Sequence, residues 1–568
     1  MKYLGAWMGK YRKKVWFALG LNLVVMVALF LVMRPYFETN DDITISGIAN
    51  GAYDVRDAHL VFINYLLGML YQLFYSLPGR LPWHTFFQYL VLWMSFSAVT
   101  YVILQKMERT AGLCAAGILL IYFSYEGYIR MQFSKVAGIA MGAALFLLFY
   151  GVTKEKISPG AIISGWILGC VGSMYRFDLS LVCALLMTGI GLFALLELVY
   201  QEKGNRLRRL IAYLVVFGVQ LCLVMGLRFF DKHMYYRDPV WKYYDEYNNV
   251  RAELMDYGFP DYENNKEAFE ALGIDKDAYD LYSGWSFDDP DKFDLEVMKG
   301  VLKLRQEKTV DKGLIADYLK KFPRDFFGVR VFYAALIFLL FCMFFGKHNV
   351  SSVVAVVYEV LLFYGLYFYL YYTGRYLVNR VDVGLWFAVC LVLLWVLFSG
   401  NMKLSPQMCG ILFLSVLIMN QRSWNSDWRI NGSSSLATRN ATRAALEMVS
   451  ADKEHLYLAK INTISAAGSF GPFNRMPIGV LNNICWLGGW ETRSGFSLKT
   501  LEKYGVVNPY RDMIGNDAVY LIDTDIDLTM RYIHTYYDET AEAVMIEKIG
   551  GCGVYQIGGT DEKADDMD

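Results

Sequence analysis

The chain has 568 residues, of which 55% are hydrophobic and only 19% are charged, and its mean hydropathy is +0.29. A soluble protein has roughly one-quarter charged residues, so this composition excludes an ordinary soluble protein. The 54 basic and 55 acidic residues leave a net charge of -1. Because that balance offers no general attraction for a polyanion, we expect no nucleic acid partner.

The apolar residues are concentrated in long runs that, apart from Glu359, contain no charged side chain. A helix rises about 1.5 Å per residue, so such a run can cross a hydrocarbon core of roughly 30 Å. The first run is too long for the core of a signal peptide and lacks a cleavage site, so we interpret it as a retained span. The predicted eleven transmembrane helices are 15–33, 84–104, 111–125, 136–153, 157–175, 179–196, 210–227, 331–346, 350–372, 383–400 and 404–419. The predicted fold class is therefore an α-helical polytopic membrane protein.

The run 60–77 is a doubtful twelfth span, because Asp57 and His59 precede it and Pro78 follows it. If it does not cross, every basic cluster between short spans lies on the cytoplasmic side, as the positive-inside rule requires. We therefore predict a helix along the outer interface. The N-terminus is then inside and the C-terminus outside.

Two polar regions then lie outside the membrane. Residues 229–324 are acidic and rich in tyrosine, with short helical segments, and residues 421–568 have the size of an independent domain. In the second region, helices are predicted at 437–449 and 528–536 and strands at 455–459, 518–522 and 553–557, so we expect a small α/β domain. The remaining parts are a transmembrane module at 1–228, with a first outer loop at 34–83, and a second module at 325–420. Whether Cys485 and Cys552 form a disulfide stays open.

Polar residues of four outer loops share one membrane face in this topology. Carboxylates there can deprotonate a hydroxyl or hold a divalent metal, and guanidinium groups can hold a phosphate. The acidic and neighbouring residues of the first loop are Asn40, Asp41, Asp42, Asp54, Asp57 and His59, and the basic residues of the later loops are Arg130, Lys135, Arg176, Arg375 and Arg380.

The arginines and the paired aspartates among these residues also have a purely structural interpretation. An arginine at a helix end can reach up to lipid headgroups, and paired aspartates in a loop can cap a helix. Glu359, in the middle of a predicted span, is costly there unless it is paired or faces a cavity, and we interpret it as structural.

The paired acids of Asn40-Asp41-Asp42, directly after the first span and followed by an interfacial helix, resemble the GT-C superfamily of membrane glycosyltransferases. The whole stretch 39–89 is similar to the opening of a group of bacterial multi-pass proteins of cell-envelope polysaccharide loci. The strings MYRFDLSL at 174–181 and GRYLVNRV at 374–381 look like later motifs of the same group.

The resemblance implies transfer of a sugar, with inversion, from a polyprenyl-phosphate lipid to an envelope glycan acceptor on the outer face of the bacterial plasma membrane. Asp41 or Asp42 would be the general base or a metal ligand, with Mg²⁺ or Mn²⁺ as the cation. The basic residues match no motif and rest on topology alone. The alternatives are a polysaccharide or lipid-carrier transporter or flippase, and a scaffold that binds cell-wall components.

Overall fold

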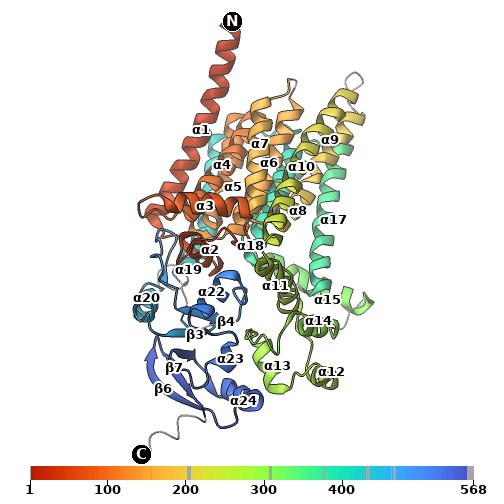
Figure 1. The fold of residues 1–568 in the computed structure, drawn as a ribbon. Helices are drawn as coiled ribbons and strands as arrows, with labels where there is room; N and C mark the ends of the chain where they lie inside the picture. Colours follow the sequence, from red (N-terminus) through yellow and green to blue (C-terminus); the bar gives the residue numbers. More distant parts are fainter. Residues whose placement is uncertain are drawn as a thin grey trace, which may run out of the picture.

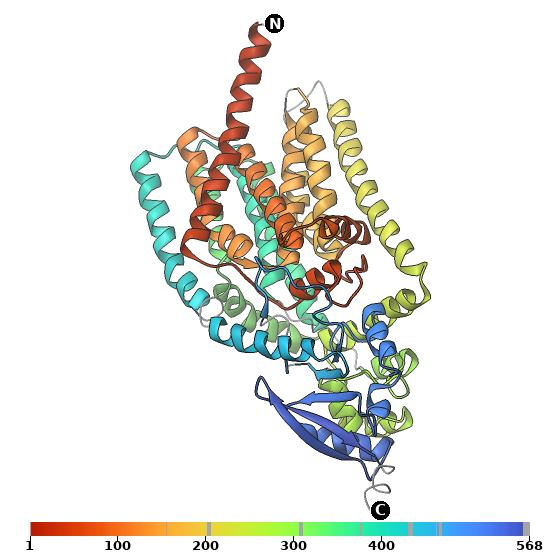
Figure 2. The same cartoon turned by 60° about the vertical axis from the view of Figure 1, so that its left-hand side comes forward.

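The computed structural model describes residues 2–154, 156–200, 206–305, 310–374, 378–429, 435–461, 463–464 and 469–559. A bundle of long helices forms one part, and shorter helices with a β-sheet form the other (Figure 1). The N-terminal helix and the C-terminal sheet lie at opposite ends of the molecule in both views (Figure 2). We call the end of the bundle that contacts the sheet and the shorter helices its domain-bearing end.

Each apolar run predicted as a span is helical. The helices are α1 (Lys2–Val32), α4 (Trp83–Lys106), α5 (Arg109–Ser124) with the π-helical turn η1 (Tyr125–Ile129), α6 (Phe133–Thr153), α7 (Pro159–Tyr175), α8 (Phe177–Leu186), α9 (Thr188–Tyr200), α10 (Arg206–Tyr236), α16 (Phe332–Phe345), α17 (Val350–Thr373), α18 (Asn379–Leu397) and α19 (Pro406–Trp428). The chain is thus a multi-pass membrane protein.

Fewer helices meet the requirements of a span than the eleven predicted. Within the described residues, eight are long and apolar enough, or nine if α16 is counted with α15 (Lys312–Gly328), from which it is bent by 96°. Helix α7 has only 17 residues, and the last third of α19 is polar, from Asn420 onward. Apolar runs in the sequence therefore located the helices, of which eight or nine have the length and composition of a span.

The run 60–77 does not form a span. Helix α3 (Tyr65–Ser76) has 12 residues and lies across the bundle (Figure 1). Gly68 allows the close approach of the preceding loop, because a Cβ at this position would lie 2.1 Å from the carbonyl oxygen of Ala58. The prediction that this segment does not cross is consistent with its length and direction.

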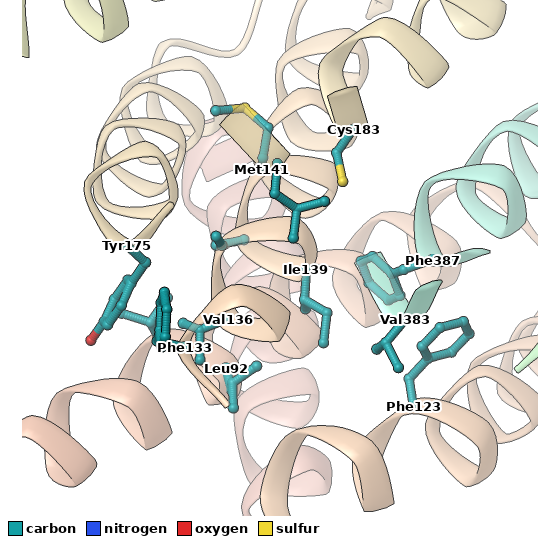
Figure 3. Close-up of a cluster of buried hydrophobic side chains, with 14 of the residues drawn as sticks. Leu92, Phe123, Phe133, Val136, Ile139, Met141, Tyr175, Cys183, Val383 and Phe387 are labelled. Carbon is teal, nitrogen blue, oxygen red and sulfur yellow. The ribbon is translucent and has the colours of Figure 1, made fainter. Parts of the chain in front are cut away.

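Helix α6 is the centre of the bundle, and every residue from Phe133 to Val152 is buried. Its apolar side chains meet those of α4, α7, α8 and α18 (Figure 3). Gly138 lets α18 approach closely, since a Cβ there would lie 2.7 Å from the Cα of Gly384. Such close packing fixes the ends of these helices relative to one another.

The domain-bearing end carries the helices of the insertion and the C-terminal domain. The insertion comprises α11 (Pro239–Tyr257), η2 (Glu263–Asn265), α12 (Lys266–Ala271), α13 (Lys276–Ser283), α14 (Leu295–Lys303) and α15. The C-terminal helices are α20 (Ser435–Ala451), α22 (Gly495–Lys503), α23 (Pro509–Asp512) and α24 (Ile526–Tyr536).

The C-terminal sheet has five strands in the order β4-β3-β5-β7-β6. Strands β4 (Ile484–Leu487), β3 (Leu456–Lys460) and β5 (Val519–Asp523) are parallel, and β7 (Cys552–Gly558) and β6 (Glu542–Ile549) are antiparallel. The three predicted strands and two predicted helices are confirmed. The two edge strands were not predicted from the sequence. Strand β4 has only four residues, and in β6 the residues do not alternate between buried and exposed.

The insertion and the C-terminal domain share one hydrophobic core. Phe269, Tyr282 and Phe293 of the insertion pack in the same cluster as Leu458 and Tyr532 of the C-terminal domain. The regions predicted as separate units at 229–324 and 421–568 therefore form one packed unit. Cys485 and Cys552 are both free in the structure.

Candidate functional site

A cavity of about 820 Å³ lies where the bundle, the insertion and the C-terminal domain meet. Residues from all four predicted loop regions line it: the first loop, the start of α6, the turn between α7 and α8, and the start of α18. Helix α11 and the segment before α22 close its other sides. The lining includes Asn40, Asp41, Ser134, Arg176, Asp178, Arg251, Arg380, Trp490 and Glu491.

Asp41 is the acid of the first loop that faces the cavity. It is the first residue of α2 (Asp41–Asn50), and Thr39 Oγ1 donates to its Oδ2 at 3.1 Å. Trp490 Nε1 donates to its Oδ1 at 3.2 Å. Burial raises the pKa of Asp41 above its ordinary value, while the charges of Arg380 and Arg176 act in the opposite direction.

Asp42 points elsewhere, because consecutive residues of a helix face directions about 100° apart. Its side chain is fully buried. Its Oδ1 lies 3.0 Å from His84 Nε2 and accepts from Gln88 Nε2 at 2.6 Å. Asp42 does not line the cavity, so the two adjacent acids have different environments.

The predicted metal site at Asp41 and Asp42 does not match this geometry. A shared cation needs both carboxylates on one side, and one of them is held by His84 and Gln88. Nor do the described residues contain a group of three or more His, Cys, Asp or Glu side chains that could hold a metal ion. We therefore derive no step through Mg²⁺ or Mn²⁺ at this pair.

Three guanidinium groups line the cavity, those of Arg176, Arg251 and Arg380. Arg176 lies over the ring of Phe62, 4.9 Å from its centroid. Arg251 was not predicted from the sequence. It comes from α11, and nothing in the local pattern shows which side of that helix faces the membrane bundle.

Arg251 is buried without a carboxylate at ion-pair distance among the described residues. Its side chain is 5% exposed, its Nε donates to Asn248 at 2.8 Å, and it lies 5.8 Å from the ring of Trp285. Burial lowers its pKa. A buried cation is costly unless an anion accompanies it, so this position favours an anionic ligand.

Two of the predicted phosphate-binding residues have carboxylate partners instead. Lys135 is buried, and its Nζ lies 2.6 Å from both Glu38 and Glu126. Arg130 lies 3.4 Å from Glu38. These carboxylates hold both basic residues, so neither Arg130 nor Lys135 lines the cavity. The sequence did not indicate these ion pairs. Arg375 lies outside the described residues.

Three further predicted site residues connect the first loop to the domains. Asp54 accepts from Asn482 Nδ2 at 2.6 Å. Asp57 lies 2.7 Å from His59 Nδ1, and the His59 ring stacks on Trp241 with centroids 4.4 Å apart. None of the three lines the cavity, so their contacts are structural links, whereas Asn40 does line it.

Glu491 is a cavity residue that the sequence did not reveal. Its carboxylate accepts from Tyr53 at 2.6 Å and from Thr44 at 3.2 Å. Burial raises the pKa of Glu491 to about 7, and the negative charge of Asp41 adds to that rise. No motif surrounds Glu491 in the sequence, and only the docking of the C-terminal domain brings it to Asp41.

The cavity also has an apolar wall. It is formed by Leu179 and Val182 of α8, Leu366 and Leu370 of α17, and Leu385 of α18. All five lie at the domain-bearing ends of membrane helices. Cations and an apolar wall in one cavity suit an amphipathic ligand with an anionic head and a hydrocarbon tail.

Comparison with known proteins gives a likeness to solved structures. No protein-family model matches the sequence, and no curated protein matches it. ArnT from Cupriavidus metallidurans in the apo state is 11% identical, with a TM-score of 0.42, over 94% of this chain and 97% of that chain. The structure of that protein bound to undecaprenyl phosphate is 11% identical, with a TM-score of 0.40, over 95% and 97%. The likeness concerns the course of the chain, and the function is argued below from this chain's own residues.

The two adjacent acids should differ in their effect on stability. We expect Asp42→Ala to lower the unfolding temperature of the purified protein, because it leaves the buried His84 and Gln88 without their acceptor, at a cost of about 1–3 kcal/mol. Asp41→Ala is the matched control and should have the smaller effect. Thermal unfolding in detergent measures both, and equal unfolding temperatures would contradict the assignment.

Stability should also depend on the protonation of Glu491. Its pKa is about 7 in the folded protein, well above the ordinary value, so the folded state binds more protons than the unfolded state between roughly pH 4.5 and 7. Its contribution to stability therefore falls as pH rises through this window.

Comparing unfolding temperatures of the wild type and Glu491→Gln from pH 5 to 8 isolates this contribution, since all other groups titrate in both proteins. The unfolding temperature of the variant should rise relative to that of the wild type as pH rises. A difference that does not change with pH would show that Glu491 is ionised throughout.

Proposed function

We propose that this protein is a glycosyltransferase that moves a sugar, with inversion, from a polyprenyl-phosphate donor to a cell-envelope glycan. The observation that carries the proposal is a single cavity in which Asp41 lies with Arg176, Arg251 and Arg380 beside an apolar wall of membrane helices. The domain-bearing end would then face the outside of a bacterial plasma membrane.

The cavity supplies both halves of a binding site for the donor lipid. The guanidinium fork matches phosphate oxygens and makes charge-assisted hydrogen bonds with them. The phosphate would also be an ion-pair partner for the buried Arg251, which has no carboxylate at ion-pair distance among the described residues. The polyprenyl tail would leave the cavity along α8 and α17, whose leucine side chains form its apolar wall.

Asp41 is placed to act as the general base. In the proposed step, its carboxylate takes the proton of an acceptor hydroxyl as that oxygen attacks the anomeric carbon. The bond between the anomeric carbon and the phosphate oxygen breaks, and the electron pair stays with the polyprenyl phosphate. Guanidinium groups stabilise the charge that develops on this leaving group. One displacement from the opposite face inverts the configuration.

Transport of a lipid carrier is the alternative from the sequence. The cavity residues come from the domain-bearing ends of the helices and from the two domains, whereas a transporter places its site near the midplane between two repeats. A carboxylate with a raised pKa next to the proposed phosphate site is suited to proton transfer in a reaction, which transport of a lipid does not require. The glycosyltransferase is therefore the better-supported proposal.

Loss of the Asp41 carboxylate should remove catalysis. We expect Asp41→Asn to reduce the release of free polyprenyl phosphate by about 10²- to 10⁴-fold, the usual contribution of a general base. The assay incubates purified protein with a panel of polyprenyl-phosphate sugars and follows the lipid phosphate. Full release by a correctly folded Asp41→Asn variant would falsify the assigned role.

Loss of an arginine in the cavity should weaken donor binding. We expect Arg251→Gln and Arg380→Gln each to raise the KM for the donor by about 10- to 100-fold, as the loss of a charge-assisted hydrogen bond predicts. Arg305→Gln is the matched control, because Arg305 lies on the surface of the same insertion, paired with Glu253 at 3.0 Å. Donor KM values that match the control would rule out phosphate binding by these two residues.

A further inference from the structure

The C-terminal domain reaches the proposed base through one side chain. Trp490 Nε1 donates to Asp41 Oδ1 at 3.2 Å, although the two residues are far apart in the chain. The indole also contacts the Phe62 ring edge to face, with centroids 5.1 Å apart. Both Trp490 and Asp41 line the cavity, so this hydrogen bond lies in the cavity wall.

The segment that carries Trp490 is held on several sides. The carbonyl of Trp490 accepts from the buried Tyr244 hydroxyl at 2.5 Å. The next residue, Glu491, accepts from Tyr53 and Thr44. Gly488 has a φ of +103°, and a Cβ there would lie 1.9 Å from the carbonyl oxygen of Trp285. The segment therefore presents the indole in one fixed orientation.

The hydrogen bond acts on both the direction and the charge of Asp41. Each carboxylate oxygen has one donor, Thr39 on Oδ2 and Trp490 on Oδ1. Two donors on opposite oxygens fix the plane of the carboxylate. Hydrogen bonds to an ionised carboxylate also favour that form, which is the form a base requires.

We propose that Trp490 is a positioning residue, contributed by the C-terminal domain, that holds the Asp41 carboxylate ionised and oriented in the cavity. This inference rests on the proposed function and adds that the C-terminal domain is part of the catalytic centre. Trp490 acts through Asp41, and its effect should therefore appear in the pH dependence of the reaction.

The test is the pH profile of kcat/KM for polyprenyl phosphate release by the full-length protein. In Trp490→Phe the Asp41 carboxylate loses one donor, so its pKa should rise. The acid limb of the kcat/KM profile should then move to higher pH by about half a unit to one unit, as the loss of one hydrogen bond predicts. Activity should approach that of the wild type at high pH. Trp428→Phe is the control, because the Trp428 indole donates to the Arg34 carbonyl instead.

A second replacement separates the N–H group from packing. The benzothiophene analogue of tryptophan keeps both rings and lacks the N–H, so introduced at position 490 it should shift the acid limb like Trp490→Phe without a loss of stability. An acid limb that stays in place in both proteins, while Asp41→Asn is inactive, overturns this inference and leaves the proposed function standing. A wild type that releases no polyprenyl phosphate from any donor overturns both.

Discussion

The docking of the C-terminal domain on α2 is the contact on which the cavity depends. Asn50, near the end of α2, donates to the Met476 carbonyl at 2.6 Å and accepts from Arg475 Nε at 2.8 Å. Backbone bonds from Gly479 to Gly51 and from Leu481 to Ala52, of 2.9 and 2.8 Å, continue the contact. Because α2 begins at Asp41, the same docking that covers the helix brings Trp490 and Glu491 to its first turn. Without it, the first loop would have acids but no enclosed site.

Charges near this end of the bundle fall into two groups with different physical consequences. One is a closed cluster in which Lys135 lies between Glu38 and Glu126, and Arg330 lies between Glu126 and Asp427. Opposite charges compensate each other there, so the cluster has little need of an added ion.

The second group lines the cavity, where three arginines lie with the carboxyl groups of Asp41, Asp178, Asp256 and Glu491. Arg251 has no carboxylate at ion-pair distance among the described residues, and its guanidinium contacts an amide and an aromatic ring. The carboxyl of Glu491 has a pKa of about 7. Environments that shift the pKa of a titratable group away from its ordinary value are common at functional sites. The carboxylate partners of Arg130 and Lys135 explain why these two basic residues do not line the cavity, whereas Arg176 and Arg380 of neighbouring loops do.

Sequence patterns predicted the helices well and the site only in part. Apolar runs locate membrane helices because the bilayer demands them, and the short loops restrict which ends share a face. That reasoning placed Asp41, Arg176 and Arg380 on one face, and all three line the same cavity. It could not separate Asp41 from Asp42, since adjacent residues share a motif but not a direction. It also missed Arg251, Trp490 and Glu491, because their place depends on how folded domains dock rather than on any local pattern.

Backbone strain marks the same junction. Val61 and Trp285, which are not glycines, have φ values of 66° and 73°, and such conformations persist only where the surroundings hold them. The Val61 N–H donates to the Tyr235 hydroxyl at 2.8 Å, and Trp285 packs its carbonyl against Gly488. Each strained residue is therefore held by a partner from another part of the chain. A site whose walls come from the bundle, the insertion and the C-terminal domain, with strain held between them, forms only when all three are assembled.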